Sequence, residues 1–371
     1  MKLIYCFLLI GISSRLAAQP PTQAKNIFII TTDGFRWQEL FNGADSELVN
    51  NVEYVKDTAL IKGLYWAGDP SERRKKLMPF LWNVVAEKGQ LYGNRQVNNK
   101  MNVKNIYKIS YPGYSEMLTG YADPRFIPNT PVQNRNMNVL EYLNTRPAFH
   151  GKVVAFTSWN IFPYILNETE SNVPVNSGYE MLDEEGDTTN SLINKVQEGV
   201  TGKGKTRYDL LTYLSAQEYI RQHKPRVVFL GLGQTDDFAH SSRYDLYLQQ
   251  ASLVDKMISD LWYYIQTDPF YKDNTALIIT TDHGRGRKAG SWHTHNTFTP
   301  GSGETWLAML GPGILPQGEI KEEQQTWEKQ LAATIALLLG EKFEAPHPVG
   351  QALLLPAASI DNMTVSKAAS R

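Results

Sequence analysis

Cysteine is almost absent from this sequence. The single cysteine, Cys6, lies in an apolar stretch at residues 3–12. Because a disulfide needs two cysteines, the chain cannot form one internally, and a thiolate nucleophile is excluded from everything after this stretch. A chain of 371 residues buries enough surface to fold without such cross-links.

The N-terminus has the pattern of a secretory signal peptide. Lys2 precedes the apolar stretch, and small residues follow it up to Ala17-Ala18-Gln19. The stretch is shorter than the roughly 20 residues of a membrane-spanning helix. We therefore expect residues 1–19 to be removed and the remaining chain to be periplasmic or secreted, with an uncleaved anchor as the alternative. Cys6 comes too early for a lipoprotein cleavage site, so a lipid anchor is not expected.

The sequence also lacks an excess of charge of either sign and any later run of transmembrane length. Its formal net charge is −1. Electrostatic binding to nucleic acid or to an anionic membrane surface is therefore not expected, nor is stable membrane insertion. The sequence does not indicate an oligomeric state.

Short apolar runs alternate with longer amphipathic segments, which is typical of α/β proteins. The expected strands are residues 26–31, 152–157, 226–231, 275–280 and 305–310. The expected helices are residues 77–87, 139–143, 208–221, 244–265 and 327–339. Because the strands are apolar almost throughout, we expect a mostly parallel sheet with helices on both faces. We expect one domain at residues 20–371.

Two polar segments, residues 42–71 and 160–206, follow strand ends and look inserted. Strand ends are where α/β enzymes build their sites, so we interpret these segments as substrate-side loops or a small cap. Ordinary surface elaboration is the alternative.

Acidic and imidazole side chains follow three of the expected strands. Thr281-Asp282-His283-Gly284 follows residues 275–280, Asp33 ends the apolar run at residues 27–30, and Asp236 follows the third strand with His240 four residues on. Each signal alone has a plain structural alternative, because Asp and Gly are common in turns and an Asp-x-x-x-His pair can be a solvated helix face. Together, at successive strand ends, they predict metal ligands.

Ser110, in the segment 108–114, is the candidate nucleophile, and His295 is a candidate third ligand for Asp236 and His240. Mixed Asp and His ligands suit Zn²⁺ or Mn²⁺ rather than Mg²⁺ or Ca²⁺. Two such ions about 4 Å apart clamp the attacking and leaving oxygens of a displacement at phosphorus.

These residues resemble the alkaline phosphatase superfamily, and most closely its type I phosphodiesterase/nucleotide pyrophosphatase-like branch. The resemblance runs from Asp33-Gly34 and the apolar strand before it to residues 348–354. Members have a Ser or Thr nucleophile followed by Pro at two residues and Thr-Gly at nine and ten. Ser110, Pro112 and Thr119-Gly120 stand at those spacings.

The resemblance implies an alkaline-phosphatase-like fold and two metal sites. One ion is shared by Ser110 with Asp33, Asp282 and His283. The other is held by Asp236, His240 and a later histidine. The family often has His-Gly at that place, which this chain lacks; counting back from Pro300-Gly301 favours His295 over His293.

The implied activity is hydrolysis of small phosphate esters through a phosphoserine. Monoesterases of the superfamily commonly place an Arg on the phosphate, whereas diesterases of this branch use an Asn. Asn129, Asn134 and Asn136 are the candidates, and both activities stay open.

Three alternatives remain. Sulfatases need Cys or Ser followed by x-Pro-x-Arg, and Tyr114 stands where that Arg belongs. Metal-dependent phosphomutases are typically cytoplasmic, which conflicts with a signal peptide. A catalytically silent metal-binding protein is the alternative of another class. The natural substrate is not indicated.

Overall fold

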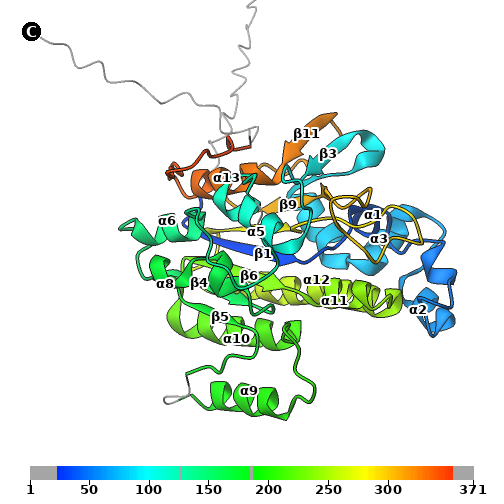
Figure 1. Ribbon diagram of the computed structural model, residues 1–371, viewed down its shortest axis with the longest axis horizontal. Coiled ribbons are helices and arrows are strands. Elements are labelled where there is room, and N and C mark those ends of the chain that lie inside the picture. The colour runs from blue at the N-terminus through cyan, green and yellow to red at the C-terminus, as the bar shows by residue number, and fades with distance from the viewer. Residues whose placement is uncertain (1–22, 126–127, 184–186, 354–371) are drawn as a thin grey trace, which may run out of the picture.

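The computed structural model describes residues 23–125, 128–183 and 187–353. The expected signal peptide lies outside these residues. An eight-stranded sheet runs through the molecule in the order β10-β2-β9-β7-β1-β6-β4-β5, with helices on both faces (Figure 1). The expected α/β architecture is confirmed.

The centre of the sheet is parallel, which brings the carboxyl ends of its strands to one edge. β1 (Asn26–Thr32) pairs in parallel with β6 (Val227–Leu232) and β7 (Thr275–Thr280). Beyond β6 lie β4 (Val153–Thr157) and β5 (Val175–Ser177), also parallel. All four expected strands in this region are present to within one residue at each end.

The far side of the sheet is partly antiparallel, and here the expected strand 305–310 is divided. β9 (Leu307–Leu310) runs antiparallel to β7 and to β2 (Gly89–Tyr92), and β10 (Gly318–Glu319) pairs with β2. β8 (Glu304–Thr305) instead joins a second sheet with β3 (Asn99–Asn102) and β11 (Gln324–Trp327). The break falls at Trp306, whose indole is buried and donates to the Phe35 carbonyl (2.8 Å).

Alternating side chains of the central strands fill two separate cores, as a sheet covered on both faces requires. Phe28 and Ile30 of β1 belong to the core under α10 and α12, whereas Ile27 and Ile29 belong to the core under α5, α6 and α13. Figure 1 shows α5, α6 and α13 above the sheet and α10 and α12 below it. The helices are α1 (Trp37–Asn42), α2 (Thr58–Tyr65), α3 (Pro70–Leu77), α4 (Ala86–Lys88), α5 (Ser110–Thr119), α6 (Val139–Thr145), α7 (Phe162–Ile165), α8 (Glu168–Ser171), α9 (Thr188–Gly199), α10 (Asp209–His223), α11 (Gln234–His240), α12 (Tyr244–Thr267) and α13 (Leu331–Leu338).

Two of the expected helices are shaped differently. The expected helix 77–87 was wrong at its start: α3 ends at Leu77, and a π-helical turn at Leu81–Val85 leads into α4. Pro79 explains the break, because the residue before a proline is driven out of the helical region, and Met78 has φ −132°. The expected helix 327–339 begins as a 3₁₀ turn, Glu328–Gln330, before α13.

The segment 160–206 holds regular structure as well as loops. It contains α7, α8, β5 and α9, and β5 extends the main sheet beside β4. α9 lies against α10, below the sheet in Figure 1. The parts that form β5 and α9 therefore belong to the scaffold of the fold. The expectation that the whole segment forms substrate-side loops or a small cap does not describe them.

Among residues 23–125, 128–183 and 187–353, no helix combines the length and the apolar character needed to cross a bilayer.

Candidate metal centre

The first group of candidate ligands forms where β1 and β7 end side by side. Asp33 follows β1, and Asp282 and His283 follow β7 after Thr281. The backbone N–H of Gly34 donates to Asp282 Oδ1 (3.0 Å), which ties the two strand ends together. Gly34 has φ +58°, and an added Cβ would lie 2.7 Å from Arg285, so this turn requires glycine.

Ser110 joins this group from the first residue of α5. Its Oγ lies 3.5 Å from Asp33 Oδ1 and 3.3 Å from His283 Nε2. His283 Nδ1 lies 2.9 Å from the Gly284 carbonyl, which can only accept, so Nδ1 carries the proton. In the neutral, metal-binding form of the ring, the lone pair of His283 Nε2 therefore points at the carboxylates and the serine.

One atom of this group is left without a hydrogen bond. Asp282 is fully buried, and its Oδ2 has no hydrogen-bond partner among the described residues. Oδ2 lies 3.5 Å from His283 Nε2, on the side where the other ligand atoms converge. A buried carboxylate oxygen without a partner is costly, and a cation there would satisfy it. The residues present thus fit a metal ion.

The pKa values show the same need for positive charge. Burial, together with the charge of Asp33, raises the pKa of Asp282 to about 8. Burial alone would lower the pKa of His283, but the charges of Asp282 and Asp33 raise it to about 9. Two carboxylates are crowded into a dry site that has one imidazole to neutralise them.

The second group is built by α11 and the loop before β8. Asp236 and His240 lie one helical turn apart, with Asp236 Oδ2 3.3 Å from His240 Nε2. His295 Nε2 lies 2.9 Å from His240 Nε2 and 3.5 Å from Asp236 Oδ1. His295 Nδ1 faces the Lys108 carbonyl at 3.1 Å, which leaves Nε2 as the free lone pair. Burial lowers the pKa of His295 well below its usual value, and a neutral imidazole is the form that binds metal.

The structure brings His295 into this group and leaves His293 outside it. A ligand atom from each of Asp236, His240 and His295 falls within 4.8 Å of the others. The ring of His293 instead lies beside Tyr54, with centroids 6.2 Å apart.

The two groups adjoin. Ligand atoms of Asp33, His283 and Asp236 also lie within 4.8 Å of one another. The rings of His283 and His295 stack with centroids 3.7 Å apart. Such closeness suits a pair of ions that act on one substrate.

Of the three candidate asparagines, only Asn129 contacts the start of α5. Its Oδ1 accepts from the backbone N–H of Tyr111, next to Ser110 (2.9 Å), and the residue is exposed. Asn134 is buried and donates to Ser115 Oγ and to the Ile165 carbonyl, and Asn136 donates to Asp123 Oδ2 (2.8 Å). Both have structural partners.

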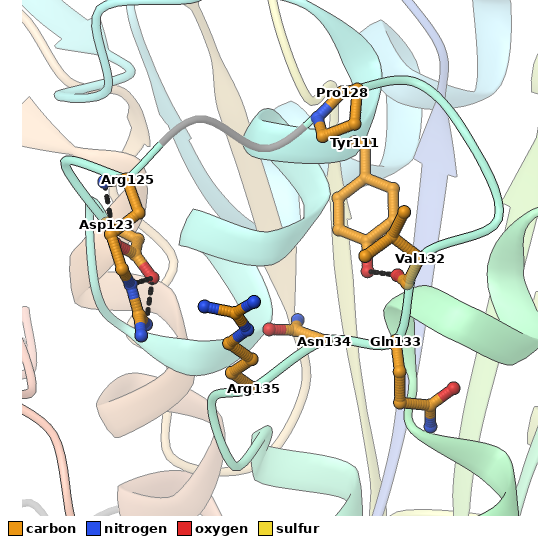
Figure 2. Close-up of a pocket in the computed structure, with 8 residues that line it drawn as sticks. All are labelled: Tyr111, Asp123, Arg125, Pro128, Val132, Gln133, Asn134 and Arg135. Atoms are coloured by element: carbon orange, nitrogen blue, oxygen red, sulfur yellow. Dashed lines mark hydrogen bonds and ion pairs between the residues drawn. The ribbon is translucent and has the colours of Figure 1, made fainter.

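A hollow of about 80 Å³ lies beside α5 (Figure 2). Neither Ser110 nor any of the six candidate metal ligands lines it. The Tyr111 hydroxyl donates to the Val132 carbonyl at one side of this hollow, and Arg125 pairs with Asp123 at the other. Asn134 lies between them. The hollow is therefore a neighbour of the candidate metal centre and not part of it.

The sequence analysis missed two residues that contact the ligands. Tyr114, one turn after Ser110 in α5, is buried and donates to Asp33 Oδ2 (3.2 Å). Arg285, two residues after His283, is fully buried and contacts Asp236. The four-residue spacing from Ser110 is a signal for Tyr114, because both lie on one helix face. Nothing marked Arg285 as buried.

No protein-family model matches this sequence, and no curated protein does. Solved structures do match. Wild-type alkaline phosphatase PafA superposes with a TM-score of 0.56 at 11% identity, over 89% of this chain and 98% of that one. The phosphonate monoester hydrolase SpPMH from Silicibacter pomeroyi gives 0.54 at 15% identity, over 89% and 76%. BT1596, a 2-O GAG sulfatase, gives 0.52 at 13% identity, over 87% and 72%.

The chain has the fold of the alkaline phosphatase superfamily. The resemblance drawn from Asp33, Ser110 and the Asp282-His283 pair is confirmed at the level of the fold. Identities this low show the fold alone, and proteins with this fold include both phosphatases and sulfatases.

Proposed function

We propose that this protein is an exported two-metal hydrolase of phosphate esters that works through a phosphoserine at Ser110. The observation that carries the proposal is the convergence of ligand atoms around Ser110 Oγ, with the buried Asp282 Oδ2 left without a hydrogen bond. Buried carboxylate oxygens normally have a hydrogen-bond partner, so an oxygen without one is expected where a metal ion is the partner.

Asp33, Asp282 and His283 would hold one ion together with Ser110, and Asp236, His240 and His295 would hold the other. The mixed oxygen and nitrogen ligands suit Zn²⁺, with Mn²⁺ as the alternative. Two divalent ions there would neutralise the phosphoryl oxygens and favour the ionised forms of the nucleophile and the leaving oxygen.

Ser110 Oγ forms a bond to phosphorus as the bond from phosphorus to the ester oxygen breaks. The proton that the Ser110 hydroxyl loses passes through water to the leaving oxygen, which departs as an alcohol. Water then cleaves the phosphoserine, which restores the hydroxyl and releases phosphate or a monoester. Ser110 is the first residue of α5, a helix of 10 residues, so the positive end of the helix dipole favours the serine oxyanion.

Diesters are the proposed substrates. Asn129 contacts the backbone at Tyr111, beside the nucleophile, and its exposed amide N–H groups make no hydrogen bond within the described part of the chain, so they can face a phosphoryl oxygen. A neutral amide can donate a hydrogen bond to the singly charged phosphate of a diester, whereas the doubly charged phosphate of a monoester is better matched by a cationic side chain. Monoester hydrolysis is the closest alternative.

A sulfatase is the second candidate, because BT1596 has the same fold. Tyr114 argues against it. This residue stands where a sulfatase needs an arginine, and its buried hydroxyl donates to Asp33 Oδ2, so this position supplies a hydroxyl and not a guanidinium. Phosphomutase activity and catalytic silence are decided by assay.

The test is a panel of three nitrophenyl substrates with Zn²⁺ or Mn²⁺ supplied. We expect bis-nitrophenyl phosphate to be turned over fastest, nitrophenyl phosphate more slowly and nitrophenyl sulfate least. Preference for the sulfate would support the sulfatase reading. Binding of two metals with no turnover of any phosphate ester would contradict the proposal and favour a silent metal-binding protein.

A further inference from the structure

Arg285 contacts three of the other chain segments that converge at the candidate metal centre. Its Nε donates to the Gly34 carbonyl, directly after Asp33 (2.9 Å). Its Nη1 donates to the His293 carbonyl, two residues before His295 (3.0 Å). Its Nη2 donates to Asp236 Oδ1. The residue itself belongs to the loop that carries Asp282 and His283.

The guanidinium is fully buried, so its contacts are held in one arrangement. A buried charge needs a partner of opposite sign and satisfied hydrogens, and Asp236 is the carboxylate that Arg285 contacts. The planar fork of an arginine fixes the direction of each hydrogen bond, which an ammonium group cannot do.

The contact divides the two oxygens of Asp236. Oδ1 is occupied by Arg285, whereas Oδ2 faces His240 Nε2 at 3.3 Å. The carboxylate is thereby held so that Oδ2 is presented to His240, while Oδ1, which Arg285 holds, lies 3.5 Å from His295 Nε2. The bond to the His293 carbonyl fixes the loop that carries His295.

We propose that Arg285 is a positioning residue for the second metal site, and that it acts on the first site far less. The inference rests on the proposed function, since it assumes two metal sites. The second group receives a direct bond to a ligand side chain and a bond to the ligand-bearing loop. With the first group Arg285 makes only the bond to the Gly34 carbonyl; the charge of Asp33 acts on it, but no hydrogen bond or ion pair joins Arg285 to Asp33 or Asp282.

The test is equilibrium binding of Zn²⁺ to the metal-free full chain, measured by competition with a chromophoric chelator. Partners that orient metal ligands typically contribute 10–100-fold in affinity. We expect Arg285→Lys, which keeps the charge and loses the fork, to weaken one of the two binding constants by about 10–100-fold. The other constant should change by less than about 3-fold, within the scatter of unrelated sites. Arg285→Gln is expected to weaken the same constant.

Repeating the measurement in a variant with only one metal site shows which of the two sites Arg285 affects. In His240→Ala, which lacks a ligand of the second group, only the first site remains, and adding Arg285→Lys should leave its constant unchanged. Arg207→Lys is the matched control: Arg207 is equally buried but is bonded to Thr212, Asn176 and Gln197. It should lower the melting temperature and leave both constants unchanged.

Equal weakening of both constants, or of neither, would overturn the positioning role. A change in the His240→Ala background would overturn the assignment to the second site. Thermal unfolding of each metal-free variant checks that it is folded, and Arg285→Lys covers the case in which Arg285→Gln does not fold. If the wild-type chain failed to bind two ions, the proposed function would fail as well, which is a distinct outcome.

Discussion

The two ligand groups are built differently, although they adjoin. The first, with Asp33, Asp282 and His283, is buried and grows out of two neighbouring strand ends. The second, with Asp236, His240 and His295, comes from a short helix and a loop, and the His240 side chain is 47% exposed. The first group is therefore fixed by the sheet, whereas the second depends on contacts made by side chains.

The two groups also differ in charge. The first group concentrates two carboxylates around one imidazole, so it lacks positive charge. In the second, a single carboxylate is already paired with Arg285, and burial lowers the pKa of both His240 and His295, which favours their neutral forms. We expect the first ion to be held more tightly and the second to exchange with solution. The predictions below test this difference.

Among the variants that compare the two ligand groups, the largest effect is expected from Asp282→Ala. It removes the carboxylate with the unpaired oxygen and leaves Asp33 without its neighbour. Activity should fall by more than the about 10²–10³-fold that loss of one transition-state donor costs. Metal content should fall to one ion per chain. Asp255→Asn, at another buried carboxylate, is the control and should keep both ions.

The histidine pair tests the second group. His295→Ala should lose the second ion and reduce kcat by more than the about 10–100-fold of an outer partner, because it removes a candidate ligand. His293→Ala should keep both ions, since its ring lies beside Tyr54. Metal analysis and steady-state kinetics on both variants check this. The reverse pattern would transfer the ligand role to His293.

The Asn129→Ala variant tests substrate binding, because both proposed metal ions act on the same phosphate ester. Asn129→Ala should lower kcat/KM for the diester on the order of 10²-fold, as loss of one oxyanion donor does. Asn136→Ala, which removes a bond to Asp123, is the control and should change the rate only slightly. Equal losses in both variants would mean that Asn129 supports the loop and does not contact phosphate.

The smallest effect is expected at Asp255, a buried carboxyl group outside both ligand groups, and it concerns stability and not activity. Asp255 accepts from the backbone N–H groups of Phe80 and Leu81, and burial raises its pKa to about 7. A carboxyl group whose folded pKa is raised favours the folded state at low pH, and this contribution is lost as pH rises from about 4 to about 7. At roughly 1.4 kcal/mol per pKa unit the loss is at most about 4 kcal/mol.

Asp255→Asn should remove this pH dependence. Urea denaturation of wild type and variant at about pH 5 and about pH 7.5 measures it. If the free energy of unfolding has the same pH dependence in both proteins, Asp255 does not titrate in this window.

The first group could be predicted from the sequence because its determinants are local. Asp33 and Asp282 come within two residues of the ends of two strands, and parallel strands bring their carboxyl ends to the same edge of the sheet. His295 could be chosen by its spacing to Pro300-Gly301, and the structure brings it beside His240.

What the sequence did not predict depends on distant contacts. Asn129 is distinguished from Asn134 and Asn136 by its bond to the Tyr111 N–H and by its exposure, neither of which the sequence gives. Arg285 sits in a run with Arg287 and Lys288 that has the composition of a solvated surface, yet it is buried. β5 has three residues, too few for a periodic pattern, so its pairing with β4 supplies the only evidence for it.

The central claim is that Ser110 is the nucleophile beside two metal ions. The most direct measurement is metal content together with turnover of bis-nitrophenyl phosphate by Ser110→Ala. Because Asp33, Asp282 and His283 remain, the account predicts about two ions per chain and no turnover above the uncatalysed rate. Turnover near that of the wild type, with both ions bound, would contradict it.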